Sequence, residues 1–239
     1  MATTTRPDLT AELVALQDEI RSDFGWDVKD DLASAFALKD AWPRTKRPLT
    51  LLRIQERLML APITVLGAAV EVEDVYKALQ DGHHIIAADG AIGVLSELES
   101  FFIAEAWSRI ICVVSDADGA PEHLDEAARR GIPFVLHAHG DNRRAWGQFL
   151  NRLEDVDLQL VLSHQTPNPL AGMINPGGFT DGDRAVCLAL HLGVAPDSIH
   201  LAGFRTDRIG RWTGATHPER KVRKLIWMAR ILDRVGVKM

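Results

Sequence analysis

Short apolar runs alternate with amphipathic windows along residues 61–239. A run that is apolar at every position fits a strand buried on both faces. Windows with apolar residues three or four apart fit helices that cover the sheet. The pattern therefore predicts an α/β fold built on a doubly wound, mostly parallel sheet. The expected strands are residues 63–66, 84–87, 110–114, 133–136, 160–162 and 199–201, and the expected helices are 72–79, 91–98, 122–130, 143–153, 183–192 and 218–235.

The first sixty residues show helical periodicity and no strand pattern. Asp8 is suited to cap a first helix, and the aspartate pair at 30–31 precedes a second one. Pro43 ends the second helix, because the residue before a proline is disfavoured in the α region. Residues 48–60 fit a third helix. We therefore expect a helical N-terminal region over residues 1–60 and an α/β catalytic domain over residues 61–239.

Composition narrows the classes of protein that remain. Hydrophobic residues make up 46% and charged residues 25%, which excludes a disordered chain. The net charge of -6 disfavours binding to nucleic acid in general. The two cysteines lie in apolar runs and predict buried thiols rather than a disulfide framework or a zinc site. No signal-like segment or membrane-length apolar stretch occurs, so we expect a cytoplasmic protein; homo-oligomer formation stays open.

Carboxylates follow three of the expected strands. Asp116 and Asp118 come directly after the third strand, and two residues spaced in this way point to one side if the chain stays extended. Because ligands bind beyond the carboxyl ends of parallel strands, Asp89 and Asp141 are expected nearby. Such a group binds Mg²⁺ well, since Mg²⁺ prefers one or two carboxylates with phosphate oxygens. The alternative is turn chemistry, which Asp-x-Asp-Gly also suits.

His137 and His139 share one face of the fourth strand and have the spacing of a metal-binding pair. No soft third ligand lies near them in the sequence, and the surrounding carboxylates favour Mg²⁺ over Zn²⁺. A histidine that hydrogen-bonds or contacts phosphate is therefore the preferred interpretation.

A glycine loop leads into the fifth expected helix. The backbone amides at Gly177 and Gly178, together with the helix start, form a possible anion site, and Arg184 adds a positive charge. A simple capping loop with Asp181 or Asp183 as N-cap explains the aspartates equally well, but not Arg184. Lys221 and Lys224 share one face of the last helix, where they either reach a triphosphate or solvate the surface. No P-loop pattern is present.

Five sequence strings occur in the order found in one enzyme family. They resemble the archaeal type of 6-hydroxymethyl-7,8-dihydropterin pyrophosphokinase over about residues 63–232. The sequence departs from the wider superfamily at Gly67-Ala68-Ala69, where a Gly-Pro-Ser turn is expected. The strings are Asp89-Gly90-Ala91, Ser115-Asp116-Ala117-Asp118-Gly119, His137-Ala138-His139-Gly140-Asp141-Asn142, Gln165-Thr166 and Gly177-Gly178-Phe179-Thr180-Asp181-Gly182-Asp183-Arg184-Ala185.

The resemblance implies a fold similar to thiamin pyrophosphokinases and an Mg²⁺-dependent transfer of a diphosphoryl group from ATP to a reduced pterin alcohol. The hydroxymethyl oxygen would attack the β-phosphorus and expel AMP. The expected catalytic residues are Asp116, Asp118, Asp141 and Arg184, and the expected metal ligands are Asp89, Asp116 and Asp118. The residues expected to bind substrates are Asp89, Gly90, His137, His139, Asn142, Gln165, Gly177, Gly178, Thr180, Asp181, Asp183, Lys221 and Lys224.

Three other functions stay open on the sequence alone. A thiamin pyrophosphokinase differs only in the shape of its acceptor pocket. A metal-dependent sugar-nucleotide transferase also uses Asp-x-Asp. A non-catalytic nucleotide-binding module is disfavoured, because phosphate binding alone does not require six carboxylates at strand ends and loops: Asp89, Asp116, Asp118, Asp141, Asp181 and Asp183.

Overall fold

A six-stranded, entirely parallel sheet forms the centre of the molecule. The computed structural model describes residues 7–42, 47–214 and 217–239. The strand order is β5-β4-β3-β2-β1-β6, and each expected strand is found within two residues of its predicted ends. The predicted α/β class and parallel sheet are thus confirmed. The strands are β1 (Ile63–Leu66), β2 (His84–Ala88), β3 (Ile110–Ser115), β4 (Phe134–Ala138), β5 (Leu160–His164) and β6 (Ile199–Ala202).

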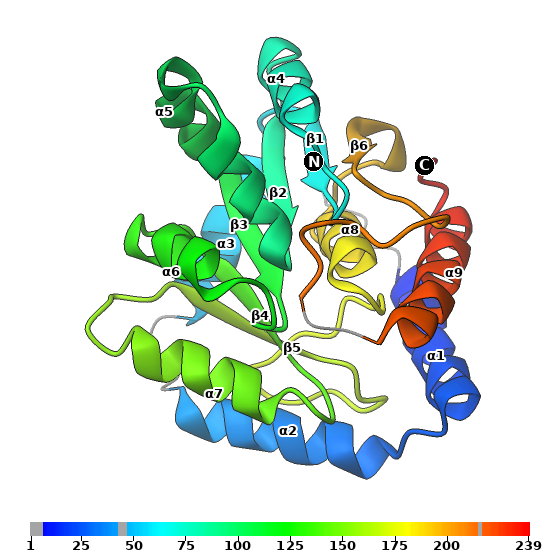
Figure 1. Cartoon of the computed structure of the whole chain (residues 1–239). Coiled ribbons are helices and arrows are strands. Elements are labelled where there is room, and N and C mark those ends of the chain that lie inside the picture. Colours follow the sequence, from blue (N-terminus) through cyan, green and yellow to red (C-terminus); the bar gives the residue numbers. More distant parts are fainter. Residues whose placement is uncertain (1–6, 43–46, 215–216) are drawn as a thin grey trace.

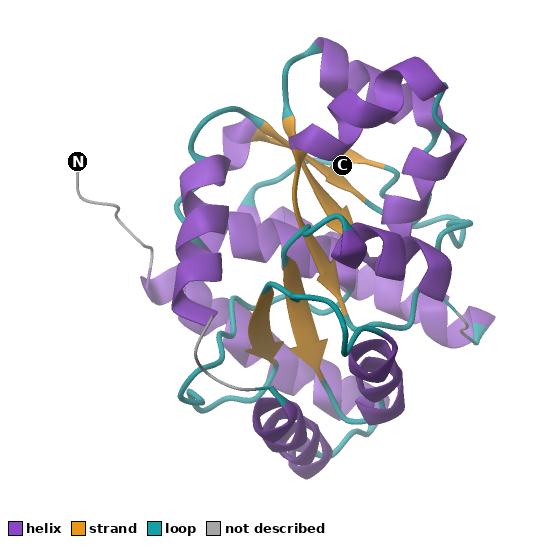
Figure 2. Ribbon diagram, turned by 90° about the vertical axis from the view of Figure 1, so that its left-hand side faces the viewer, coloured by secondary structure: helices purple, strands orange, loops and turns teal. Residues whose placement is uncertain are grey.

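Helices cover both faces of the sheet and give three layers (Figures 1 and 2). The chain steps in one direction from β1 to β5, so right-handed crossovers place their helices on one face. The return from β5 to β6 reverses direction and places its helix on the other face. The first face carries α2 (Val28–Ala41), α4 (Val72–Gln80), η2 (Asp89–Glu97), α5 (Ser100–Arg109), α6 (Pro121–Arg129) and α7 (Arg143–Arg152); the second carries α1 (Pro7–Phe24), α3 (Arg47–Leu58), α8 (Asp181–His191) and α9 (Pro218–Val235), and the short η3 (Pro196–Ser198) precedes β6.

Two apolar cores lie on the two faces of the sheet. Successive strand residues alternate between them, as Ile85 and Ile86 do in β2. The N-terminal helices belong to these same cores: Leu38 of α2 packs in the first, and Ile20 of α1 and Leu58 of α3 pack in the second. The predicted helical character of this region is confirmed by α1, α2 and α3. A domain boundary at residue 60 stays a prediction.

Local structure differs from the sequence-based expectation in three places. Asp27 is the N-cap of α2 and accepts a hydrogen bond from the Lys29 amide at 2.9 Å, so this helix begins before the aspartate pair. Asp8 lies inside α1 rather than at its cap, because that helix begins at Pro7. The helix expected at 91–98 is the 3₁₀ helix η2, and α5 after it was not predicted. Their apolar residues lack one clear period, which hid the break between them.

No helix among the described residues combines the length and the apolar character needed to cross a membrane.

The pH dependence of stability is expected to include a contribution from His164 at the end of β5. Its side chain is buried, and its Nδ1 accepts a hydrogen bond from the Thr166 amide at 3.1 Å. Burial lowers the pKa of His164 from 6.5 to about 4. Between pH 6.5 and about 4, His164 binds a proton in the unfolded chain but not in the folded chain. The free energy of unfolding therefore decreases as the pH falls through this range.

We therefore expect that lowering the pH from 7 to 5 destabilises the wild type by up to about 2 kcal/mol more than the His164→Asn variant. Urea unfolding of both proteins at each pH measures the difference. Parallel pH profiles would show that His164 does not contribute.

Candidate active site at the carboxyl ends of the strands

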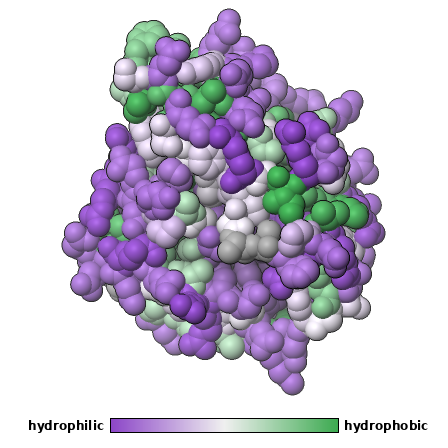
Figure 3. Space-filling model, viewed as in Figure 1, coloured by the Kyte–Doolittle hydropathy of each residue, from purple (hydrophilic) through white to green (hydrophobic). Residues whose placement is uncertain are grey.

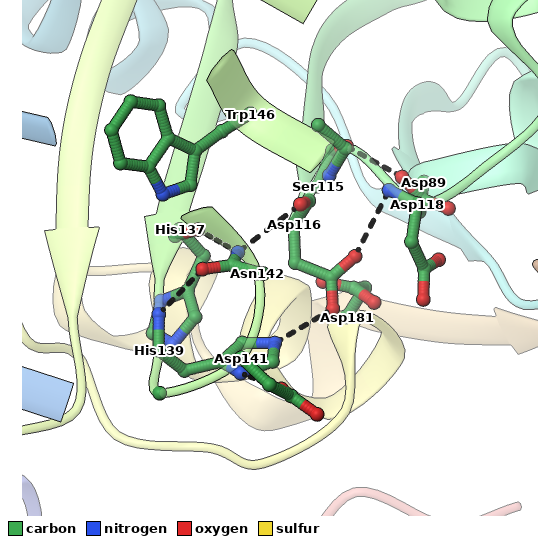
Figure 4. Close-up of polar contacts among 12 residues, drawn as sticks. Asp89, Ser115, Asp116, Asp118, His137, His139, Asp141, Asn142, Trp146 and Asp181 are labelled. Atoms are coloured by element: carbon green, nitrogen blue, oxygen red, sulfur yellow. Dashed lines mark hydrogen bonds and ion pairs between the residues drawn. The ribbon is translucent and has the colours of Figure 1, made fainter. Parts of the chain in front are cut away.

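Three carboxylates meet where β2 and β3 end. Asp89 follows β2, and Asp116 and Asp118 follow β3; one carboxylate oxygen of each lies within 4.8 Å of the others (Figure 4). Ser115, the last residue of β3, holds the turn that follows this strand. Its hydroxyl donates to Asp89 at 2.5 Å and accepts from the Ala117 amide at 2.8 Å. Two backbone conformations are left-handed, at Asp89 (φ 47°) and Ala117 (φ 66°), which non-glycine residues adopt at an energetic cost. The surrounding structure therefore enforces this convergence.

The convergence shifts the pKa values of the carboxyl groups. Burial, followed by the charges of Asp116 and Asp181, raises the pKa of Asp89 well above its usual value. Partial burial and the Asp116 charge raise the pKa of Asp118 to about 6, and burial with the same charge raises that of Asp181 to about 7. Burial alone would raise the pKa of Asp116, but the hydrogen bond and charge of His139 outweigh it and lower this pKa. These four groups form an acidic cluster whose repulsion a bound cation would relieve.

His139 connects the acidic cluster to Asp141. Its Nε2 lies 3.1 Å from Asp116 Oδ2, and its Nδ1 lies 3.1 Å from Asp141 Oδ1. Burial would lower the pKa of His139, but the hydrogen bonds to these two carboxylates outweigh burial and raise it. The arrangement favours an imidazolium that holds Asp116 in its ionised form.

Asn142 lies between Asp116 and His137, as Figure 4 shows. Its amide nitrogen donates to the Asp116 carbonyl at 3.1 Å and to the His137 carbonyl at 2.7 Å, and its oxygen accepts from the His139 amide at 3.0 Å. Asn142 is buried, so its hydrogen-bonding groups fix the loops after β3 and β4 relative to each other.

A buried polar network joins the strand ends to the N-terminal helices. Gln165 Oε1 accepts from Arg184 Nη2 at 2.8 Å, and Gln165 Nε2 donates to both oxygens of Asp31 at 3.0 Å. Asp31 also accepts from the Gly140 amide at 2.8 Å and pairs with Arg21 at 3.2 Å. Sequence reasoning did not select Arg21 or Asp31, because nothing in the N-terminal pattern separates them from ordinary helix residues. The network ties α1 and α2 to the site.

The cations of the site lie on α8 and α9. Arg184 is buried, its Nη1 lies 3.5 Å from Asp181, and its Nε has no hydrogen-bond partner among the described residues. Lys221 and Lys224 share one face of α9, and burial lowers the pKa of Lys224. Both lysines line the cavity that Asp116, Asp118 and Asp181 also line, and their contact with a triphosphate stays a prediction.

The start of α8 is fixed by a capping box between Thr180 and Asp183. Asp183 accepts from the Phe179 amide at 2.6 Å, the Thr180 amide at 2.8 Å and the Thr180 hydroxyl. Gly177 and Gly178 have φ values of 89° and 86°, and a Cβ at these positions would meet Leu13 and the Arg184 backbone respectively. These glycines therefore permit close packing of the loop against α1 and α8.

Three adjoining hollows lie at the carboxyl ends of the strands. The central cavity is lined by Asp116, Asp118, His139, Arg184 and Lys224, among others. The switch-point cavity lies where the strand order reverses between β1 and β6. The α1–α2 hollow lies beside the start of α2 and the loop after β4. The face seen in Figure 1 is largely hydrophilic, with hydrophobic atoms in small separate groups (Figure 3).

The structure divides the predicted site residues into two groups. The residues that line these hollows are Asp89, Asp116, Asp118, His139, Asp141, Gln165, Thr180, Asp181, Arg184, Lys221 and Lys224. The residues that line none of them, and whose contact with a ligand stays a prediction, are Gly90, His137, Asn142, Gly177, Gly178 and Asp183.

Packing explains the position of the second group. Gly90 approaches the Trp212 carbonyl so closely that a Cβ would lie 2.4 Å from it. His137 is buried, with Ser163 at 3.0 Å and Gln165 at 3.3 Å, and burial followed by the Arg184 charge lowers its pKa well below the usual value. Gly90 and His137 therefore contact other residues of the protein and lie behind the walls of the hollows. Lining residues that sequence reasoning did not select include Trp26, Asp30, Phe204, Trp212 and Thr213.

Comparison with known proteins supports the resemblance seen in the sequence strings. No protein-family model matches the chain. Curated relatives named 6-hydroxymethyl-7,8-dihydropterin pyrophosphokinase occur in three archaea. The chain is 33% identical to the Methanocaldococcus jannaschii protein (73% of this chain, 71% of the relative), 34% to that of Pyrococcus furiosus (82% and 78%) and 35% to that of Methanothermobacter thermautotrophicus (77% and 73%). Because these matches span most of both chains, the chain belongs to the family of 6-hydroxymethyl-7,8-dihydropterin pyrophosphokinases.

Proposed function

We propose that this chain transfers the β,γ-diphosphoryl group of ATP to the hydroxymethyl oxygen of 6-hydroxymethyl-7,8-dihydropterin and releases AMP. The observation that carries this proposal is the acidic cluster, three members of which line one cavity together with the buried cation Arg184. Membership of the family indicates that the two substrates are ATP and the pterin. Such an arrangement suits a metal-assisted reaction of a polyphosphate, because both signs of charge are needed to hold the metal and the phosphates.

The donor set fits Mg²⁺. Asp89, Asp116 and Asp118 offer three oxygen ligands within 4.8 Å of one another, and no sulfur or imidazole ligand belongs to this group. Oxygen ligands of this kind, with room for water and phosphate oxygens, are those that Mg²⁺ prefers. When bound, Mg²⁺ would offset the charge of the phosphate oxygens and polarise the β-phosphorus.

The protein's own residues position the reactants and neutralise charge. The pterin hydroxymethyl oxygen forms a bond to the β-phosphorus while the bond from that phosphorus to the α,β-bridging oxygen breaks, so AMP leaves with this oxygen. Arg184, Lys221 and Lys224 hold the phosphate oxygens and offset the charge that builds up on AMP. One of two carboxylates that follow the strands, Asp89 after β2 or Asp141 after β4, accepts the proton of the pterin hydroxyl group.

Incubation of the purified protein with ATP, Mg²⁺ and a panel of hydroxymethyl compounds tests this function. We expect AMP and diphosphorylated pterin in equal amounts, and neither product with thiamin. Chromatography measures both. AMP release with thiamin but not with the pterin, or preferential binding of a sugar nucleotide over ATP, would contradict the proposal.

Removal of divalent cations is expected to abolish turnover, because the acidic cluster by itself repels the phosphates of ATP. The measurement is AMP formation after treatment with EDTA, followed by addition of Mg²⁺ in excess. Full recovery with Mg²⁺ is expected, together with an unchanged circular dichroism spectrum throughout. Undiminished turnover in EDTA would exclude the metal.

A further inference from the structure

The three hollows form a series. The switch-point cavity shares Asp118, Asp181 and Lys221 with the central cavity. The α1–α2 hollow shares Trp26, His139 and Gln165 with the central cavity and no lining residue with the switch-point cavity. The acidic cluster and its cations therefore lie between two outer hollows.

In-line transfer requires the attacking and leaving oxygens on opposite sides of the phosphorus. If the β-phosphorus lies at the acidic cluster, the acceptor and the nucleoside of ATP extend away from it in different directions. The two outer hollows provide these directions, one for each substrate.

Charge decides which hollow takes which substrate. The switch-point cavity has Arg205, Arg208 and Lys221 on its wall, and Asp89, Asp118 and Asp181 of the acidic cluster lie there as well. These cations, together with a metal ion at the carboxylates, suit a nucleotide, and the small residues of the turn after β1 leave room for it. The α1–α2 hollow is lined by four carboxylates and, among the described residues, by no lysine or arginine, so its wall repels phosphate groups. These carboxylates are Asp27, Asp30, Asp31 and Asp141. A neutral ring with several N–H donors suits this acidic wall.

Trp26 and Asp30 are the side chains of the α1–α2 hollow suited to such a ring. Phe24 stacks on Trp26 with centroids 4.6 Å apart and an interplanar angle of 26°, and Arg220 and Lys224 each lie 5.7 Å from the centroid of the same indole. These neighbours fix the indole in place. Asp31 is already bound to Arg21, Gln165 and the Gly140 amide. The Asp30 side chain, by contrast, is exposed on the wall of the hollow, and its carboxylate has no hydrogen-bond or ion-pair partner among the residues that the structure describes.

We propose that the pterin acceptor binds in the α1–α2 hollow, with its ring against Trp26 and its N–H edge on Asp30, while the nucleoside of ATP binds in the switch-point cavity. This inference rests on the proposed function and adds a role for the N-terminal helices. They supply the acceptor specificity of a site whose chemistry lies at the strand ends.

The test compares Michaelis constants for the two substrates. Asp30→Asn is expected to raise the KM for the pterin about 10-fold and to change the KM for ATP less than about twofold, as expected for loss of one charged hydrogen bond. Trp26→Ala is expected to raise the KM for the pterin about 10-fold, as expected for loss of one stacking contact, and to raise the KM for ATP by a smaller factor, because Lys224 lies over the indole. Phe204→Ala, in the switch-point cavity, is the reciprocal variant. It is expected to raise the KM for ATP and not that for the pterin.

Calorimetric binding of the pterin and of a non-hydrolysable ATP analogue gives the same comparison without turnover, so an inactive wild type contradicts only the proposed function. Weaker binding of the ATP analogue by Trp26→Ala, with unchanged pterin binding, would overturn the assignment of the hollows. Unchanged binding of both ligands by Trp26→Ala and Asp30→Asn would also overturn it. Circular dichroism confirms that each variant is folded.

Discussion

Asp116→Asn is expected to lower kcat for AMP formation by about 10³-fold, because a metal ligand that stabilises transition-state charge contributes several kcal/mol. Asp116 is the group of the acidic cluster whose pKa is lowered, so it is the carboxylate best kept ionised for binding a cation. Asparagine has nearly the same shape, and its oxygen can still accept the hydrogen bond from the Asp118 amide at 3.3 Å. The fold is therefore expected to persist.

The control is Asp155→Asn, which removes an exposed carboxylate that pairs with Arg129 at 3.4 Å, away from the hollows. This variant is expected to retain the wild-type kcat. Thermal unfolding by circular dichroism shows whether both variants are folded. A folded Asp116→Asn protein that forms AMP at the wild-type rate would remove Asp116 from the mechanism and with it the role of the acidic cluster.

Arg184→Met is expected to lower kcat by about 10²- to 10³-fold, the effect seen when a fixed donor to a developing negative charge is lost. Arg184 is held by Gln165 at 2.8 Å and by Asp181 at 3.5 Å, so its guanidinium is placed before a substrate arrives. Arg184→Lys keeps the charge but not the planar fork. Its activity is expected to fall between those of the wild type and Arg184→Met.

The matched control is Arg129→Met on α6, whose side chain is about half exposed. It is expected to leave kcat unchanged. Equal kcat values for Arg184→Met and the wild type would show that the phosphates are neutralised by other cations. If circular dichroism shows that Arg184→Met is unfolded, the test is made with Arg184→Lys. The kcat of Arg184→Lys must then lie below that of the wild type.

The carboxylates of the site could be located from the sequence because a general rule of topology places them. Asp89, Asp116 and Asp141 each follow a run of apolar residues, and in a parallel sheet every such position falls at the same edge. The convergence of Asp89 with Asp116 and Asp118 follows from this rule. The proposed metal-binding role of these three side chains stays a prediction.

Other predictions had no such rule behind them. Some residues of the same sequence strings contact other parts of the protein. Asn142 and Asp183 form hydrogen bonds with backbone groups, and Gly177 and Gly178 allow a close approach of neighbouring atoms that a Cβ would prevent. A sequence string records that a residue type is required. It does not record whether the requirement comes from a ligand or from packing.

The sequence by itself determined the parallel sheet, its strands and the edge at which polar groups gather, because burial on both faces leaves a pattern that is local in the chain. Only the tertiary structure decided that α1 and α2 reach this edge. Arg21 and Asp31 meet Gln165, which lies more than a hundred residues away in sequence. Contacts of this kind depend on how helices dock on the finished sheet, and side chains that meet only after docking leave no periodic signal in the chain.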